Sequence, residues 1–304
     1  MFMDVTDLPP DPLAGTRYRF VRVLGCGGSS DVFEAAGPSG ERFAIKVLRE
    51  TFRDIQQYAT RFLQEGRILA AIDHPHIVPL REIGMTRDGR PFLVMPRMPG
   101  QPLSHYLEQH GPLEPNTAAM LLAGALDGLQ EAHRRGVVHR DVKPENIFVV
   151  TNDAGTPEKA LIFDFGIAKI SGAAAHRTTG DRILGTPRYV SPEQIFGGRL
   201  DGRIDVYAMG IVLFESIAAR GPYDLLRSAQ FDAIIRAHLS VTPRRLDDLS
   251  PASAALACVI ARALEKAPGK RFASAGAFAD SLRKAVRFST RNESNAAREG
   301  CLSC

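Results

Sequence analysis

The hydrophobic pattern of the chain changes its period near residue 100, and this change limits the folds that it can adopt. Before that point, apolar and polar residues alternate in short segments rich in aromatic and β-branched side chains, which predicts β-strands. One stretch there, 53–72, has helical spacing, and after residue 102 helical spacing dominates, as in 115–135. The sequence predicts an α+β fold with two lobes: an antiparallel five-stranded sheet with one main helix, and a larger, mostly helical lobe. The expected strands are 17–24, 31–36, 42–48, and a pair within 74–98.

A length of 304 residues suits one large bilobal domain or two domains. We expect the first lobe at 17–97 and the second at 98–286. Residues 1–16 are expected to be a flexible arm, and the polar segment 287–304 a disordered tail.

Composition excludes several classes of protein. The net charge of +4 is small and spread along the chain, so we expect no nucleic-acid partner. The most apolar run, 206–214, is too short to span a membrane and is expected to be a buried helix. The N-terminus is acidic and rich in proline, unlike a signal peptide. The cysteines follow no disulfide framework, which favours a reducing, cytoplasmic setting: Cys26, Cys258, Cys301 and Cys304.

Two apolar runs enclose a dense polar stretch, HRDVKPEN, at 139–146. The carboxylate of Asp141 can orient a hydroxyl group and accept its proton. The amide oxygen of Asn146 and the carboxylate of Asp164, at the end of the next expected strand, suit Mg²⁺. Lys143 can neutralise charge on a transferred group. These residue types at this spacing indicate phosphoryl transfer, which needs mainly positioning and charge compensation.

Two further features fit phosphate binding, although each has an ordinary alternative. Gly25 and Gly27 lie between two expected strands, where their backbone N–H groups could approach phosphates; a simple hairpin turn would also use them. Lys46 stands in an apolar strand, and Glu65 follows on the expected helix, where it could hold the ammonium toward phosphates. A solvent-facing lysine and a solvated helix charge are the alternatives.

The order of these motifs, completed by DFG at 164–166 and SPE at 191–193, resembles the eukaryotic-like Ser/Thr protein kinase family over roughly residues 17–285. The compact architecture resembles cytoplasmic bacterial members. The resemblance implies ATP and Mg²⁺ as cofactors, Asp141 as catalytic base, and Asn146 and Asp164 as Mg²⁺ ligands. It also implies that Lys46, paired with Glu65, contacts the α- and β-phosphates, and Lys143 is typical of the Ser/Thr kinases.

The resemblance also implies an adenine pocket. Adenine is expected between Val32, Ala44 and Phe148, with Met95 as gatekeeper. The carbonyl of Pro96, which proline retains, and the N–H of Met98 would bond the ring. The third loop glycine is replaced by Ser30, which leaves the backbone donors in place. The residues implied to contact ATP are Leu24, Gly25, Cys26, Gly27, Gly28, Val32, Ala44, Lys46, Met95, Pro96, Met98 and Phe148.

The segment between DFG and SPE resembles the regulatory segment of the family. Thr178 and Thr179 fall where members accept activating phosphates, and Arg140 could bind such a phosphate. The alternative is that both are ordinary loop threonines. Thr186 resembles the residue that bonds Asp141 and Lys143.

Several buried contacts are implied as well. An apolar stack anchored by Asp205 is expected, together with an ion pair between Glu193 and Arg271. The stack would comprise Leu69, Leu80, His139 and Phe165.

Three functions agree with these residues to different degrees. The motifs that resemble peptide-docking segments favour protein substrates over the small-molecule kinases of related fold. A pseudokinase scaffold that binds ATP is the non-enzymatic alternative, and it would need Lys46, Asp141, Asn146 or Asp164 to be idle. Autophosphorylation between two copies of the chain would require transient dimerisation.

Overall fold

The computed structural model describes residues 11–52, 55–165, 187–198, 200–223, 231–249 and 254–301. The side chains of Gln56, Gln57, Arg61, Glu65 and 290–301 lie outside this description. The chain divides into two compact units, each with its own core. The first comprises Met1–His74 and Val78–Pro99, and the second Pro75–Ile77 and Gly100–Cys304.

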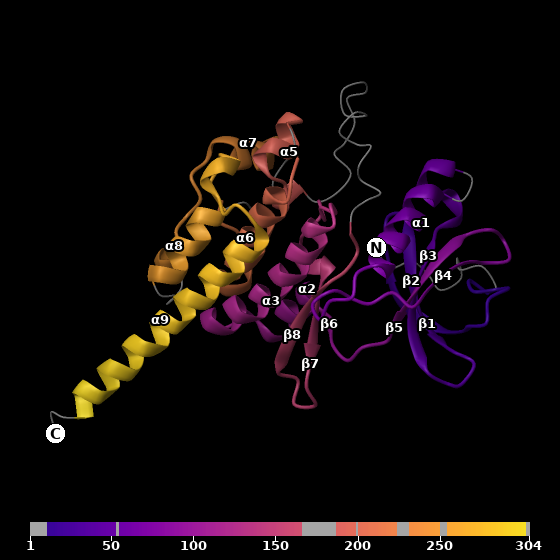
Figure 1. Cartoon of the computed structure of the whole chain (residues 1–304), viewed down its shortest axis with the longest axis horizontal. Coiled ribbons are helices and arrows are strands. Elements are labelled where there is room, and N and C mark those ends of the chain that lie inside the picture. The colour runs from indigo at the N-terminus through magenta and orange to yellow at the C-terminus, as the bar shows by residue number, and fades with distance from the viewer. Residues whose placement is uncertain are drawn as a thin grey trace. The chain divides into compact units, whose positions relative to one another are not determined.

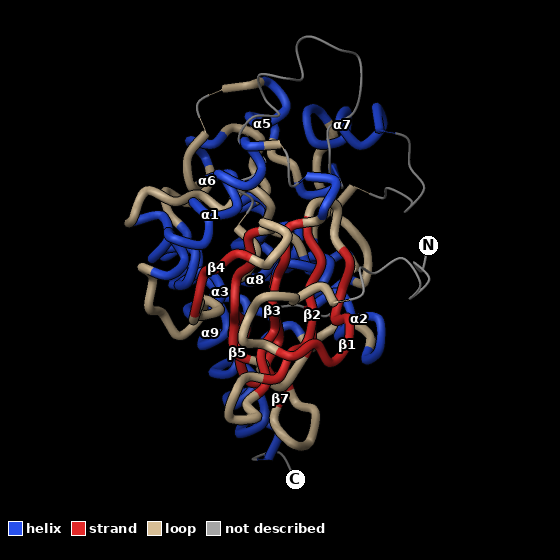
Figure 2. Tube along the Cα trace, turned by 90° about the vertical axis from the view of Figure 1, so that its right-hand side faces the viewer, coloured by secondary structure: helices blue, strands red, loops and turns tan. Residues whose placement is uncertain are grey.

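The first unit is built on the expected five-stranded sheet (Figures 1 and 2). Its strand order is β1-β2-β3-β5-β4, and every neighbouring pair is antiparallel. Helix α1 contacts β4 and β5. The predicted α+β fold is confirmed. The elements are β1 (Arg19–Cys26), β2 (Ser30–Ala36), β3 (Arg42–Leu48), α1 (Gln56–Ala70), β4 (Glu82–Met85) and β5 (Pro91–Pro96).

Strand β4 is shorter than the sequence suggested, since only Glu82–Met85 pairs with β5. Pro75 and Pro79 lack the N–H groups that a central strand needs. The short stretch Pro75–Ile77 belongs to the second unit instead, where the N–H of Ile162 donates to the His76 carbonyl over 2.8 Å.

The end of the predicted flexible arm is packed rather than free. Leu13 is only 1% exposed and joins the apolar cluster of the first unit. The N–H of Arg87 donates to the Ala14 carbonyl over 2.7 Å. Gly15 has a φ of +81°, which favours glycine and turns the chain beside Arg87. The expectation of a flexible arm is therefore wrong for residues 11–16, because Leu13 fills a core position.

The second unit is mostly helical. Helix α6 is buried along nearly its whole length, as the apolar run 206–214 predicted, and packs against α3 and α8. Strands β6, β7 and β8 form a small antiparallel sheet. The elements are β6 (Gln101–Pro102), α2 (Leu103–His110), α3 (Pro115–Arg134), β7 (Ile147–Thr151), β8 (Pro157–Ile162), α5 (Pro192–Phe196), α6 (Arg203–Ala218), α7 (Phe231–Ser240), α8 (Ala254–Ala263) and α9 (Ala275–Cys301).

Helix α9 continues to Cys301 (Figure 1), so the expectation of a disordered tail is wrong for residues 287–301. The polarity of this stretch argues against burial, but it does not argue against a helix. Between Ala275 and Glu299 the only glycine is Gly276 and there is no proline, while alanine, arginine and glutamate favour helix.

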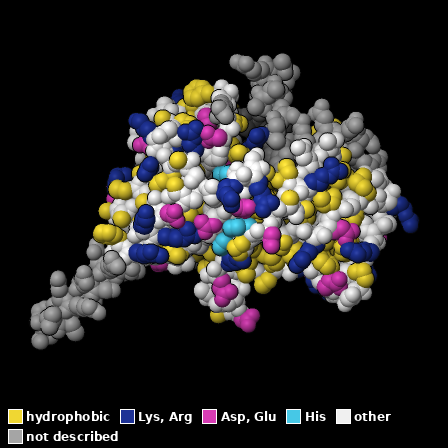
Figure 3. Space-filling model, viewed as in Figure 1, with side chains coloured by type: hydrophobic (Ala, Val, Ile, Leu, Met, Phe, Trp, Pro, Cys, Tyr) yellow, Lys and Arg dark blue, Asp and Glu magenta, His cyan; other side chains and the backbone are white. Residues whose placement is uncertain are grey.

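Surface charge of both signs is interspersed on the face shown in Figure 3. Within the described residues, no helix combines the length and the apolar character that crossing a membrane requires.

Candidate phosphoryl-transfer site

A buried carboxylate holds the backbone of the HRD stretch in the second unit. Asp205, near the start of α6, is 1% exposed. Its Oδ2 atom accepts from the N–H of His139 over 2.8 Å, and its Oδ1 accepts from the N–H of Arg140 over 2.9 Å. Arg140 has a φ of +67°, an uncommon conformation for a residue with a side chain. The carboxylate accepts both hydrogen bonds and thus fixes a strained loop that carries His139, one member of the predicted stack.

His133, on α3, is a third partner of that carboxylate. Its Nε2 lies 2.7 Å from Asp205 Oδ2. His133 was not among the predicted residues, because its neighbours Glu131, Arg134 and Arg135 are charged and give no signal of a buried contact.

His139 connects the loop to the strand end that carries Asp164. The N–H of Asp141 donates to its Nδ1 over 3.2 Å, so the ring proton sits on Nε2. Nε2 then donates to the Phe163 carbonyl over 3.0 Å. The ring packs against Phe165, with centroids 4.6 Å apart. The second-unit half of the predicted apolar stack is therefore present.

The other two members of that stack belong to the first unit. Leu69 is 8% exposed, and Leu80 packs against the cluster around Phe62. Their continuation toward His139 and Phe165 stays a prediction.

Among the described residues, the side chains of Lys143 and Asn146 contact the Asp141 carboxylate. Lys143 Nζ lies 3.1 Å from Asp141 Oδ2. Asn146 Nδ2 donates to the same Oδ2 over 3.1 Å and to the Asp141 carbonyl over 2.8 Å. Asp141 and Lys143 each keep a side-chain exposure of 20%, so the carboxylate is oriented but still accessible. This arrangement suits a group that receives a proton from an incoming hydroxyl.

Asn146 and Asp164 lie next to the paired ends of two neighbouring strands, as predicted. Asn146 directly precedes β7 and Asp164 follows shortly after β8, and Ile147 pairs with Ile162. The N–H of Phe163 donates to the Asn146 carbonyl over 3.2 Å. Asp164 has a φ of +58°, so its backbone is held in a strained conformation that is often found at functional sites.

The donor chemistry of this pair fits a divalent cation. The amide nitrogen of Asn146 is directed to Asp141, which leaves the amide oxygen for a cation. Asp164 supplies a carboxylate, and hard cations prefer such oxygen ligands.

In the first unit, one face of the sheet gathers the residues expected to face a nucleotide. Val32 pairs with Lys46, and Ala44 pairs with Met95, and directly opposed residues project to the same face. The Lys46 ammonium lies 5.5 Å from the centre of the Phe62 ring. The Glu65 side chain is outside the description, so its pairing with Lys46 remains a prediction.

The glycine-rich turn closes tightly between β1 and β2. The N–H of Gly27 donates to the Ser30 carbonyl over 2.8 Å. A Cβ atom at Gly27 would lie 2.8 Å from that same oxygen, so this position requires glycine. Leu24, Gly25 and Cys26 end strand β1, and the Cys26 thiol is exposed.

The remaining adenine-pocket candidates fall in both units. Pro96 ends β5, and the Met98 carbonyl accepts a hydrogen bond from the Arg97 guanidinium. Phe148 lies on β7 of the second unit, with its ring edge-on to Phe163.

The threonines of the predicted regulatory segment, Thr178, Thr179 and Thr186, lie outside the described residues. Their expected partner Arg140 is described, and its Nε is a buried nitrogen with no hydrogen-bond partner in the described part of the chain. A buried guanidinium nitrogen without an acceptor suits an anion.

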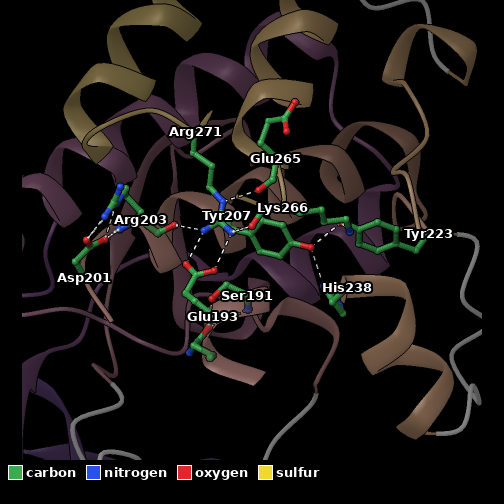
Figure 4. A network of polar contacts seen from close by, with 11 residues as sticks. Ser191, Glu193, Asp201, Arg203, Tyr207, Tyr223, His238, Glu265, Lys266 and Arg271 are labelled. Atoms are coloured by element: carbon green, nitrogen blue, oxygen red, sulfur yellow. Dashed lines mark hydrogen bonds and ion pairs between the residues drawn. The ribbon is translucent and has the colours of Figure 1, made fainter. Parts of the chain in front are cut away.

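The predicted buried ion pair between Glu193 of the SPE stretch and Arg271 is present (Figure 4). Arg271 binds Glu193 of α5 through both terminal nitrogens, at 2.7 and 2.9 Å. The arginine side chain is fully buried.

Comparison with known proteins agrees with this geometry. The family model described as "Protein kinase domain" matches residues 18–282. Serine/threonine-protein kinase Pkn1 of Myxococcus xanthus is 38% identical over 297 residues, covering 96% of this chain and 42% of that protein. Serine/threonine-protein kinase PknJ of Mycobacterium tuberculosis is 36% identical over 272 residues, covering 88% of this chain and 45% of that protein. The chain thus spans less than half the length of these two curated relatives.

A solved structure of a kinase domain has a similar fold. The crystal structure of the Mycobacterium tuberculosis PknI kinase domain matches with a TM-score of 0.69 and 27% identity, covering 91% of this chain and 100% of that one.

Proposed function

Because the chain belongs to the protein kinase domain family, we propose that it acts as a serine/threonine protein kinase, transferring the γ-phosphoryl group of ATP to Ser and Thr hydroxyls of proteins. The observation that carries this proposal is the Asp141 carboxylate, held by Lys143 and Asn146 on a loop that Asp205 fixes. The intact set of predicted catalytic residues argues against a pseudokinase scaffold.

In the proposed reaction the substrate hydroxyl oxygen bonds to the γ-phosphorus while the bond from that phosphorus to the bridging oxygen of ADP breaks. Asp141 orients the hydroxyl and takes its proton. Lys143, 3.1 Å from that carboxylate, is placed to compensate charge on the transferred group.

Nucleotide binding is assigned to residues of both units. Lys46 would contact the α- and β-phosphates with Glu65 as its partner, and the turn around Gly27 would offer N–H groups to phosphate oxygens. Val32, Ala44, Met95 and Phe148 would enclose adenine.

Asn146 and Asp164 would hold the metal ion, which we propose to be Mg²⁺. When bound, the ion would supply positive charge to the phosphate oxygens. The oxygen donors of both side chains suit such a hard cation, and the amide orientation of Asn146 supports this assignment.

Phosphorylation of Thr178 or Thr179 is proposed as the regulatory event. The buried Arg140 Nε–H, which has no hydrogen-bond partner among the described residues, would donate a hydrogen bond to the phosphate. Transfer between two copies would make the rate depend on protein concentration.

The test is autophosphorylation with Mg²⁺ and ATP, with sites mapped by mass spectrometry, for the wild type and Asp141→Asn. We expect phosphate on Thr178 or Thr179 in the wild type, its loss on chelation of the metal, and at least about a hundredfold lower rate in the variant, in line with general-base contributions. Wild-type protein that binds ATP but transfers no phosphate, to itself or to any protein or peptide offered, would favour the scaffold.

A further inference from the structure

Three arginines gather around one glutamate in the first unit. Nε of Arg22 donates to Oε2 of Glu34 over 2.9 Å. Nη1 of Arg42 lies 3.6 Å from Oε1 of Glu34, and Nε of Arg97 lies 3.8 Å from Oε2. The glutamate side chain is only 12% exposed, whereas the Arg22 and Arg42 side chains are 61% and 49% exposed. The guanidinium groups thus reach solvent, while the carboxylate between them is largely covered.

Strand pairing adds a fourth arginine, Arg19, to this group. Arg19 is opposite Ala36 on β2, and Ala36 is opposite Arg42 on β3. The N–H of Arg97 donates to the Arg42 carbonyl over 3.1 Å. Directly opposed residues project to the same face of a sheet, and so do residues two apart on one strand, such as Glu34 and Ala36. The fourth arginine therefore shares the face that carries Glu34. We call this group the arginine cluster: Arg19, Arg22, Arg42 and Arg97.

The arginine cluster carries more positive charge than the acids around it neutralise. Guanidinium groups stay protonated, so four arginines around one carboxylate leave an excess of three positive charges. The Glu41 carboxylate accepts from the N–H of Ser39 over 3.0 Å, within the turn between β2 and β3. Asp31, at the other end of β2, binds Arg49 at 2.8 Å. Both acids are engaged away from the cluster, so its excess charge remains.

The arginine cluster lies apart from the residues proposed to bind the phosphates of ATP. Arg42 begins β3, and Lys46 is four residues further along that strand, which is about 14 Å. On β2, Ser30 adjoins the glycine-rich turn and Ala36 ends the strand, about 20 Å away. A nucleotide whose phosphates lie at Lys46 and the turn does not bring them to the cluster. The cluster is therefore open to a second anion.

The side chains and their spacing fit a phosphate carried by an extended protein segment. All four members are arginines, whose planar fork binds a phosphate through two N–H groups. The cluster extends from β1 across β2 and β3 to the end of β5 in one sheet (Figure 2). Three strand spacings amount to about 14 Å, the length of roughly four extended residues. One such segment could therefore place a phosphate and a second acidic side chain on different arginines.

Two other polyanions fit the arginine cluster less well. Proteins that bind a membrane surface usually insert apolar side chains, and those that bind single-stranded nucleic acid stack bases on aromatic rings. In the described part of the first unit, the large apolar side chains exposed to solvent are Ile55 and Met85. Ile55 directly precedes α1 and Met85 ends β4, so neither lies on the strands that carry the cluster.

We propose that the arginine cluster binds a phosphorylated serine or threonine in an extended segment of a protein. Arg22 and Arg42, which meet at the two oxygens of Glu34, would hold the phosphate. Arg19 or Arg97 would hold a neighbouring acidic side chain. The choice of a protein-bound phosphate rests on the proposed function, because a serine/threonine kinase makes that group. The chain would thus bind proteins that are already phosphorylated, at a place separate from phosphoryl transfer.

The test measures binding of a short fluorescent peptide to the full chain without ATP. The peptide consists of alanine and glycine, with one phosphothreonine and a glutamate two residues later, and its control has threonine instead. Fluorescence anisotropy should show at least about tenfold tighter binding of the phosphorylated peptide, because its hydrogen bonds join two charged groups. Vesicles of phosphatidylcholine and phosphatidylserine should not bind the chain.

Four variants locate the binding in the arginine cluster. Arg22→Gln and Arg42→Gln should each weaken binding of the phosphorylated peptide about fivefold or more. Arg87→Gln is the matched control: this arginine is exposed in the turn between β4 and β5, at the other end of β5, and its loss should change affinity less than about twofold. Glu34→Gln keeps an acceptor for Arg22 but removes the negative charge, so it should tighten binding about threefold. Thermal unfolding midpoints would show that each variant is folded.

Several results would overturn the proposal. These are equal affinity for the two peptides, equal losses in Arg42→Gln and Arg87→Gln, or no tightening in Glu34→Gln. Binding to the vesicles but not to the phosphorylated peptide would assign the cluster to a membrane surface instead. A chain that binds the peptide as expected but transfers no phosphate would remove only the proposed function. An active kinase that binds both peptides equally would remove only this inference.

Discussion

At the scale of single residues, Arg271 uses every donor of its guanidinium group. Besides the two bonds to Glu193, it donates to the carbonyls of Glu265, Arg203 and Lys266 over 2.7, 3.0 and 3.0 Å. A lysine has one nitrogen and cannot reproduce this fork. We expect Arg271→Lys to lower the free energy of unfolding by roughly 3 kcal/mol, because it leaves a buried carboxylate and several carbonyls with poor partners. Urea unfolding measures this.

The pair of Arg203 and Asp201 is a matched control for Arg271→Lys. Its guanidinium also binds a carboxylate through two nitrogens, here Nε and Nη2 at 2.6 to 3.1 Å, but its side chains are 36% and 44% exposed. Arg203→Lys should therefore cost less than about 1 kcal/mol. Similar losses in the two variants would show that burial does not decide the contribution of Arg271.

The sequence predicted most directly which residues lie close together where they flank neighbouring strands. Asp141, Asn146 and Asp164 flank two neighbouring strands, so a strand prediction already brought them together. Tyr207 and Lys266 carry no such signal: Tyr207 lies on α6 and Lys266 follows α8, and they are connected through the Tyr223 hydroxyl. His133 likewise became recognisable only through its contact with Asp205.

At the scale of secondary-structure elements, helix α3 begins at a cap that its sequence encodes. Pro115 occupies the first turn, and the Glu114 carboxylate accepts from the N–H groups of Asn116 and Thr117 over 2.9 and 2.7 Å. The sequence predicted this helix at 115–135, and it spans Pro115–Arg134. For α9 the prediction of disorder is wrong only over 287–301, where the polar composition suggests disorder but helix propensity prevails.

The cap gives stability a pH dependence. Burial raises the pKa of Glu114, but the hydrogen bonds from Asn116 and Thr117 outweigh it, and the pKa ends below its ordinary value of 4.5. A carboxyl with a lowered pKa adds stability above its unfolded-state pKa and loses it as the pH falls through the folded-state value. We expect Glu114→Ala to lower the free energy of unfolding by about 1 kcal/mol at pH 7, with the difference shrinking below pH 4.5.

Glu114→Gln serves as the control for the cap, since it keeps an acceptor oxygen without a charge. It should lose less than the alanine variant and show little dependence on pH. Urea midpoints for the three proteins between pH 7 and pH 3.5 test this. A gap between wild type and alanine that stays constant across the range would contradict the role given to the ionised cap.

At the scale of the whole molecule, each unit has a separate core. In the first, Leu13 packs with Tyr18 and the inner residues of the sheet, and the Arg90 guanidinium donates to the Pro12 carbonyl over 3.4 Å. In the second, most of α6 is buried and Leu282 of α9 is fully buried. The residues proposed to bind the nucleotide come from both units, whereas each apolar core belongs to one unit.

Because the two cores are separate, we expect a core mutation to destabilise mainly the unit in which it lies. Leu13→Ala removes a fully buried side chain and should cost roughly 2–5 kcal/mol. Because that loss falls on the first core, we expect amide hydrogen exchange to rise in β3 and β5 while the slowest amides of α6 stay unchanged. Leu282→Ala should do the reverse, raising exchange in α3 and α6 and leaving β3 protected. If either variant raised exchange equally in both units, the chain would unfold as one cooperative block, and the packed residues 11–16 would stabilise the second unit as much as the first.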